Sequence, residues 1–303
     1  MLTTIFCAVD DFCKLYEKAF ACKCLSGGKG IRLRESSMTV SEVITIMIYS
    51  KHYGYKNFKT FYLREFETLK KYFPKLVSYT RFIELQKMVL QPLAVFLKTC
   101  LMQKCTGSSF IDSTRLCVCN THRRYSCKLM RSMASSGKTS TGWFFGMKLH
   151  LIITPNGEIV DFIVTSGNVA DNNHDVIMRL CKNAYGKIFG DKGYIMREDF
   201  LRLLNLQGVF FVTKKRKNMK KEATRLSDNQ NLKNRGVIES VLNVLKTKFD
   251  LEHSRSRSVG GFLNNILVAI SAYVFKDQKP SVKIKGGVFE NYSENSAFLL
   301  SLA

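Results

Sequence analysis

Five apolar, strand-like runs between residues 110 and 213 constrain the fold more than any other feature of the chain. They cover residues 110–118, 143–153, 159–165, 187–191 and 209–213. The first three follow one another, and a Pro-Asn-Gly-Glu turn at residues 155–158 joins the second to the third. Helical patterns cover residues 171–183, 196–204, 236–249 and 262–275. The resulting βββαβαβα order predicts an α/β fold, in the form of a mixed α+β sheet flanked by helices.

Residues 1–106 are predicted to form an all-helical N-terminal module, with DNA-end binding as a candidate role. Thr39 and Glu42 form a capping box in front of an apolar run. A later helix is predicted to start near Thr80 and to kink at Pro92. We expect the sheet domain to span residues 107–279 and residues 280–303 to form an irregular tail.

Aromatic residues crowd the middle of this helical region, interleaved with lysines. They are Tyr53, Tyr55, Phe58, Phe61 and Tyr62. Such residues could stack on nucleic acid, but we favour core packing, with the lysine stems lying along the apolar surface.

The charge of the chain is strongly unbalanced. Forty-seven Lys and Arg against 24 Asp and Glu give a net charge of +23, which favours a polyanionic partner, most often nucleic acid. The basic residues are spread along the chain, so a membrane surface is disfavoured, and the apolar stretch at residues 262–275 is short for a membrane span. Ten cysteines and no recognisable secretory signal predict free thiols and a cytoplasmic protein.

Three carboxylates occupy positions typical of an active site. Asp112 and Asp191 lie at the ends of strand-like runs, in Ile-Asp-Ser-Thr and Gly-Asp-Lys-Gly-Tyr. Glu239 lies on a predicted helix, four residues after Arg235 and seven before Lys246, so these three residues share a helix face. Carboxylate oxygens suit hard divalent cations such as Mg2+. Two such ions about 3.5–4 Å apart can activate an attacking oxygen and stabilise a leaving one.

Each piece also has a simpler explanation. Asp112 alone would more often cap a strand end, and Asp191 with Gly193 is a common turn pair. Arg235, Glu239 and Lys246 alone would more often be solvated ion-pair partners on a helix. All three carboxylates in this order, in so basic a chain, favour the active-site interpretation.

The chain resembles bacterial insertion-sequence transposases of the DDE type. The resemblance rests on the segments around Asp112, Asp191 and Glu239 and on the Trp-Phe-Phe-Gly-Met-Lys-Leu-His segment at residues 143–150. It covers roughly residues 35–277. The family helix often carries a Tyr three residues before the Arg, a position that Leu232 occupies here.

The resemblance implies a ribonuclease-H-like catalytic domain with Asp112, Asp191 and Glu239 as ligands of two Mg2+ or Mn2+ ions. It also implies cutting and joining of DNA at element terminal repeats and at target DNA, usually by a homodimer. Arg235 and Lys246 would contact phosphates or moderate the acidic cluster. A metal-dependent nuclease of the same fold without strand transfer and a catalytically inactive DNA-binding relic stay open as alternatives.

Two basic runs flank the carboxylates. Residues 113–157 contain seven Lys or Arg and no acidic residue. The predicted phosphate-contacting residues are Arg115, Arg123 and Arg124 in this run and Lys214, Lys215, Arg216 and Lys217 in the second. Contacts of this kind would make binding salt-dependent without reading sequence.

Two further polar clusters are assigned structural roles. Cys117, Cys119, His122 and Cys127 could suggest zinc, but the two thiols of a C-x-C on a strand point to opposite faces, so we disfavour a metal there. Asp171 is expected to cap the helix that follows it, and His174 could lie near the active site.

Overall fold

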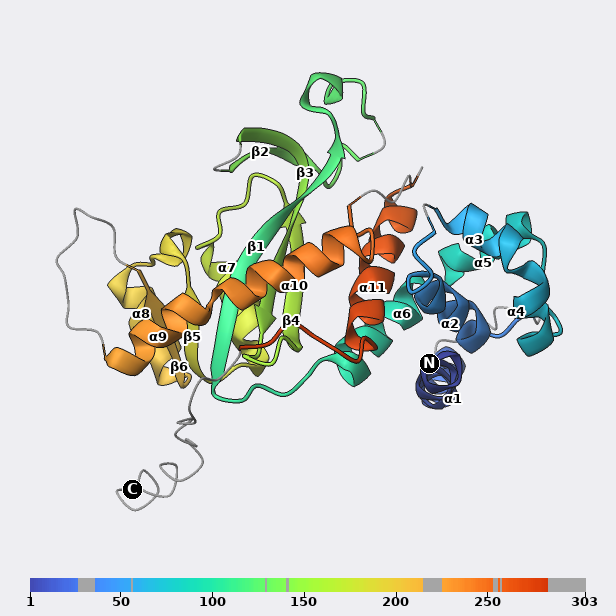
Figure 1. Cartoon of the computed structure of the whole chain (residues 1–303), viewed down its shortest axis with the longest axis horizontal. Helices are drawn as coiled ribbons and strands as arrows, with labels where there is room; N and C mark the ends of the chain where they lie inside the picture. Colours follow the sequence, from blue (N-terminus) through green and yellow to red (C-terminus); the bar gives the residue numbers. More distant parts are fainter. Residues whose placement is uncertain are drawn as a thin grey trace, which may run out of the picture.

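The computed structural model describes residues 1–26, 36–55, 57–128, 130–139, 142–214, 225–252, 256 and 258–282. Its centre is a six-stranded mixed sheet, with helices packed on both faces and a group of N-terminal helices to one side (Figure 1). None of the helices in these ranges is long and apolar enough to cross a lipid bilayer.

The sheet has the strand order β4-β3-β1-β5-β6, with β2 paired to β3 as well. The strands are β1 (Ser108–Cys119), β2 (Ser135–Thr139), β3 (Gly142–Ile153), β4 (Ile159–Ser166), β5 (Gly186–Gly190) and β6 (Val209–Thr213). Neighbours β1 and β3, β3 and β4, and β2 and β3 are antiparallel. The pairs β1–β5 and β5–β6 are parallel. The two strands predicted to carry the aspartates, β1 and β5, are therefore direct neighbours.

Each face of the sheet has its own hydrophobic core. Helix α10 (Gly236–Thr247) crosses one face, where Ile238 and Val241 pack with Phe110 of β1 and Phe189 of β5 (Figure 1). Helices α7 (His174–Leu180) and α8 (Glu198–Leu206) cover the other face, around Ile111. Because side chains alternate along a strand, Phe110 and Asp112 face α10, whereas Ile111 and Ser113 face α7.

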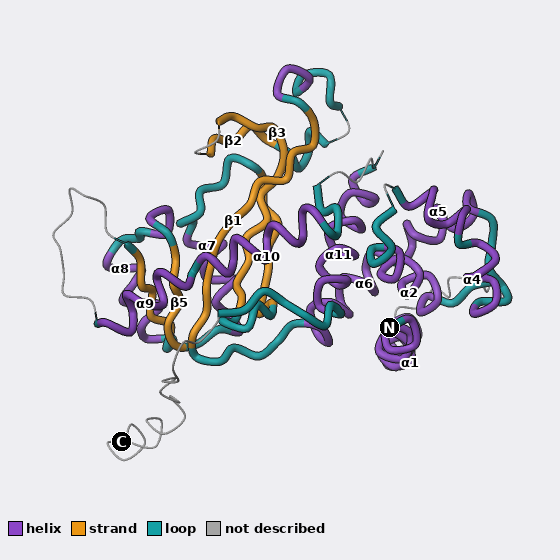
Figure 2. Tube along the Cα trace, in the orientation of Figure 1, coloured by secondary structure: helices purple, strands orange, loops and turns teal. Residues whose placement is uncertain are grey.

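The N-terminal third is helical and shares its core with the α10 face of the sheet. Its helices are α1 (Leu2–Ser26), α2 (Val40–Ser50), α3 (Phe58–Arg64), α4 (Phe66–Tyr72), α5 (Tyr79–Met88) and α6 (Leu90–Phe96), which continues into a π-helical turn at Leu97–Leu101. Helix α11 (Val259–Val274), from the end of the chain, packs against α2, α5 and α6 (Figure 2). A domain boundary near residue 106 stays a prediction.

Several local predictions are confirmed. Thr39 and Glu42 form the expected capping box, and β6 has the predicted bounds. The apolar run near the C-terminus forms the buried helix α11. Core packing of the aromatic residues is also confirmed for Phe61 and Tyr62, which are 1% and 0% exposed.

Other predictions need correction. Strand β2 and helix α9 (Leu226–Asn234) were not anticipated, because neither segment has a continuous apolar pattern. The predicted kink at Pro92 is instead a helix break at Val89, and Pro92 lies in the first turn of α6. Proline is tolerated there because the amides of a first helical turn have no intrahelical acceptor.

Of the predicted tail, only residues 280–282 are among those that the structure describes. The Val282 amide donates a hydrogen bond to the Pro155 carbonyl over 2.9 Å, so this short stretch lies along the turn between β3 and β4.

Candidate active site

The parallel pairing of β1 and β5 places two aspartates at the same level of the sheet. Phe110 of β1 pairs with Phe189 of β5. Asp112 and Asp191 each lie two residues beyond that pair, and parallel neighbours are about 4.8 Å apart. Asp112 is still within β1, whereas Asp191 follows the end of β5 and begins a 3-10 turn by accepting a hydrogen bond from the Gly193 amide over 2.7 Å.

Helix α10 brings the third carboxylate, that of Glu239, toward Asp112. Arg235 precedes the helix and joins two of the acids. Its Nη1 lies 3.4 Å from Asp112 Oδ2, and its Nη2 lies 3.0 Å from Glu239 Oε1. The Asp112 and Arg235 side chains are 19% and 20% exposed, whereas that of Glu239 is 62% exposed. The guanidinium therefore occupies the space between a half-buried acid and a solvent-facing one.

The electrostatics of Asp112 reflect all of these neighbours. Burial raises the pKa of its carboxyl to about 6. The hydrogen bond from the Ser113 amide and the charge of Arg235 oppose that shift, whereas the charges of Asp191 and Glu239 add to it. The charges of Asp191 and Glu239 thus both reach Asp112, and the charge of Arg235 offsets part of their effect.

These groups suit a hard divalent cation by their chemistry. They supply carboxylate oxygens, which Mg2+ and Mn2+ prefer. Within the ranges that the structure describes, however, no three His, Cys, Asp or Glu side chains are already arranged to hold a metal ion.

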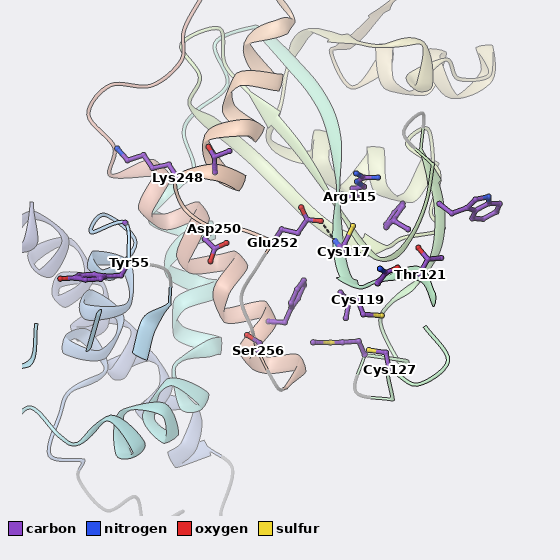
Figure 3. A pocket seen from close by; sticks show the side chains of 18 residues that line it. Tyr55, Arg115, Cys117, Cys119, Thr121, Cys127, Lys248, Asp250, Glu252 and Ser256 are labelled. Carbon is purple, nitrogen blue, oxygen red and sulfur yellow. Dashed lines mark hydrogen bonds between the residues drawn. The ribbon is translucent and has the colours of Figure 1, made fainter. Parts of the chain in front are cut away.

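Lys246, the third member of the helical motif, lies elsewhere. Its Nζ is 3.3 Å from Glu252 Oε2, and Glu252 Oε1 accepts a hydrogen bond from the Cys117 amide over 2.9 Å (Figure 3). Cys117 is five residues beyond Asp112 on β1. Two turns of α10 separate Lys246 from Glu239, a rise of about 10 Å, so a shared helix face does not bring Lys246 to the acids.

Some of the predicted phosphate-contacting residues can be located. Arg115 lines a cavity of about 970 Å³ together with Glu252 and Lys248 (Figure 3). Arg123 is exposed on the segment between β1 and β2, and the Arg124 guanidinium lies 4.5 Å from the Tyr125 ring centre. Lys214 is exposed just after β6. Lys215, Arg216 and Lys217 lie outside the described residues.

The three thiols of the cysteine cluster line the same cavity. Cys117, Cys119 and Cys127 are all free. Burial raises the pKa of Cys117 to about 11, with the neighbouring Glu252 as a further cause, so its thiol is protonated at neutral pH.

The expectation for Asp171 is wrong. The N-cap of α7 is Asn173, whose side chain accepts a hydrogen bond from the Val176 amide. Asp171 instead accepts a hydrogen bond from Ser113 Oγ over 2.7 Å and pairs with Lys148 over 3.1 Å. No local sequence signal identified this role, because both partners come from distant strands. His174 is exposed at the start of α7, and its ring stacks on Phe200 with 3.9 Å between centres.

A comparison with known protein families identifies the family of this chain. Residues 102–259 match the sequence model of the transposase DDE domain family. The match covers more than half of the chain and includes β1 to β6, α10 and all three carboxylates. The chain belongs to the transposase DDE domain family, and it is a DDE-type transposase by sequence. No curated protein matches the chain.

Proposed function

We propose that this protein cuts and joins DNA strands at the ends of its own insertion element, with Asp112, Asp191 and Glu239 as ligands of two Mg2+ or Mn2+ ions. One observation carries the proposal. Within the family-matched region, the charges of Asp191 at the end of β5 and of Glu239 on α10 both act on Asp112 of β1, and Arg235 contacts Asp112 and Glu239. When bound, the ions would activate the attacking oxygen and stabilise the leaving oxygen of a phosphodiester.

The sheet topology supports a ribonuclease-H-like catalytic domain. In that fold the first strand lies beside the fourth of the core sheet, and the third acid comes from a later helix packed on it. The order β4-β3-β1-β5-β6 has β1 beside β5, and α10 packs against β1. Strand β2 is an addition paired to one end of β3.

The residues of the chain itself would bind and orient the DNA. Arg235 contacts both Asp112 and Glu239. If divalent ions compensated the charge of these two carboxylates, the guanidinium of Arg235 would be available to a phosphate. Arg115, Arg123, Arg124 and Lys214 would contribute further phosphate contacts, which position DNA without reading its bases. Lys246 is assigned to support of α10 through Glu252 rather than to the phosphates.

The test is a reaction of the purified protein with duplexes that carry the DNA flanking its gene, in Mg2+ or Mn2+. Nicking at the element end followed by joining to a second duplex is expected, and Asp191→Ala is expected to abolish both. The exposed neighbour Lys192 provides a matched control, since Lys192→Ala alters the same turn without removing a carboxylate. Nicking retained in Asp191→Ala would refute the site assignment.

The same reaction separates the alternatives. Cleavage without joined products, on duplexes with correct element ends, would indicate a nuclease of the same fold. DNA binding without any metal-dependent cleavage would indicate an inactive relic. A homodimer with both element ends and target DNA as partners is part of the proposal, and sedimentation of the protein with element-end DNA tests it.

A further inference from the structure

A second polar network lies on the opposite face of β1 from Asp112. Ser113 follows Asp112, so its side chain points toward α7. Its Oγ donates a hydrogen bond to Asp171 Oδ1 over 2.7 Å. Lys148 Nζ on β3 donates to the same oxygen over 3.1 Å and to the Val169 carbonyl over 2.9 Å. Asp171 therefore links β1 to β3 directly behind the proposed metal ligand.

Ser113 connects this network to Asp112. Its amide donates a hydrogen bond to Asp112 Oδ1 over 2.8 Å, while its hydroxyl is held by Asp171. The orientation of one backbone amide thus influences the direction of the Asp112 carboxylate. A displacement of Ser113 would move that amide and turn the carboxylate.

Asp171 also lies beside the turn that carries Asp191. A Cβ atom placed on Gly193 would lie 2.9 Å from Asp191 Oδ1 and 3.6 Å from Asp171 Oδ2, so the two carboxylates flank this glycine. The hydroxyl of Tyr194 is buried. Burial first, and then the charges of Asp112, Asp171 and Asp191, raise the pKa of that hydroxyl well above its usual range. The charges of all three aspartates therefore reach the Tyr194 hydroxyl.

The contacts of Asp171 are those of a supporting residue. Lys148, with a side chain only 9% exposed, supplies its counter-charge. Ser113 Oγ and Lys148 Nζ both donate hydrogen bonds to Asp171 Oδ1, and both donors belong to strands of the sheet. An acid compensated in this way is stable without a metal ion and can fix the position of its donors.

We propose that Asp171, which lies beside the turn that carries Asp191, is a positioning residue for the metal site. Through its hydrogen bond with Ser113, Asp171 holds the Asp112 carboxylate in place. The inference rests on the proposed function of Asp112 and Asp191 as metal ligands. Residues that orient metal ligands from behind typically change metal affinity or activity by roughly 10–100-fold when removed.

The test compares four variants of the full-length protein, Asp171→Ala, Asp171→Asn, Ser113→Ala and the double variant Asp171→Ala with Ser113→Ala. Mn2+ affinity is measured by calorimetric titration without DNA, and cleavage is measured with the element-end duplex. Asp171→Ala is expected to weaken both by roughly 10–100-fold. Asp171→Asn keeps an oxygen acceptor for Ser113 and is expected to retain most of both. The double variant is expected to lose no more than the worse single variant, because both changes break one link.

Asp175→Ala is the matched control, since Asp175 is an exposed acid four residues away on α7. Urea unfolding of each variant shows whether the variant is still folded. A loss of Mn2+ affinity in a folded variant is then attributed to displacement of the Asp112 carboxylate. An Asp171→Ala protein with unchanged Mn2+ affinity and cleavage overturns the inference. An Asp171→Asn protein that is folded yet as impaired as Asp171→Ala also overturns it, because the charge itself would then be needed. The proposed function is overturned as well if the wild-type protein does not cleave DNA and the Asp112→Asn variant binds Mn2+ as tightly as wild type.

Discussion

Glu252 fastens the end of α10 to β1, and its replacement should measurably lower the free energy of unfolding. One carboxylate oxygen accepts a hydrogen bond from the Cys117 amide over 2.9 Å, and the other lies 3.3 Å from Lys246 Nζ. The side chains of Glu252 and Lys246 are 15% and 25% exposed, so solvent screens the pair only in part. Glu252→Gln retains an acceptor for the amide but removes the charge that faces Lys246.

The magnitude follows from the two contacts. A hydrogen bond to a charged group contributes about 1.5–3 kcal/mol, against about 0.5–1.5 kcal/mol for a neutral one. Glu252→Gln should therefore cost about 1 kcal/mol, which in a chain of this size lowers the melting temperature by roughly 1–2 °C. Glu252→Ala also leaves the Cys117 amide without its acceptor and should cost about 3 kcal/mol.

The effect should depend on pH in a defined direction. The hydrogen bond to Cys117 and the charge of Lys246 outweigh burial and hold the pKa of Glu252 below its ordinary value of 4.5. An acid with a lowered folded-state pKa stabilises the protein above its unfolded-state pKa, and this stability is lost as the pH falls through the folded-state value. The difference between wild type and Glu252→Gln should therefore be full at neutral pH and should disappear under strongly acidic conditions.

Urea unfolding followed by circular dichroism, at neutral pH and at a pH of about 3, measures both quantities. Lys246→Met in the Glu252→Gln background should cost less than it does in wild type, since the pair is already broken. A Glu252→Gln protein as stable as wild type at neutral pH would refute the reasoning, and so would a deficit that persists unchanged in acid.

Three further changes test the core. Gly146→Ala should destabilise the sheet by at least about 2 kcal/mol in urea unfolding, because the added Cβ would lie 2.0 Å from the Leu116 carbonyl oxygen; an unaffected midpoint would contradict this. Burial, with a contribution from Lys148, lowers the pKa of His150 to about 4. Up to about 3 kcal/mol of the free energy of unfolding should therefore be lost as the pH falls from about 6.5 to about 4. In the His150→Gln variant, the free energy of unfolding should depend less on pH over this range. Tyr273→Phe removes the hydrogen bond to the Gly157 carbonyl and should cost about 1 kcal/mol by thermal unfolding, unlike a change at an exposed tyrosine.

Much of the secondary structure could be predicted because it depends on short-range patterns. The apolar runs of β1 and β3 and the turn before β4 predict three consecutive strands without any tertiary information. The capping box at Thr39 is equally local, since both of its hydrogen bonds join residues three apart. Strand β2 could not be found in this way, because Ser-Ser-Gly-Lys-Thr forms a strand only where the edge of β3 offers it a partner.

The features of the candidate site likewise fall into those that the sequence predicts and those that only the tertiary structure determines. The sequence alone predicted Asp112, Asp191 and Glu239 as acids of one centre, because the three segments occur together and in this order in a basic chain. The family match confirms the prediction of a DDE-type transposase. Only the tertiary structure decided the partners of the charged residues around them. Lys246 pairs with Glu252, and Asp171 supports Ser113 instead of capping a helix. The physical reason is the short distance over which these interactions act. Sequence periodicity determines which face of a helix or strand a side chain occupies. A hydrogen bond, however, needs its partner within about 3 Å, and the packing of distant strands and loops determines which residue lies that close.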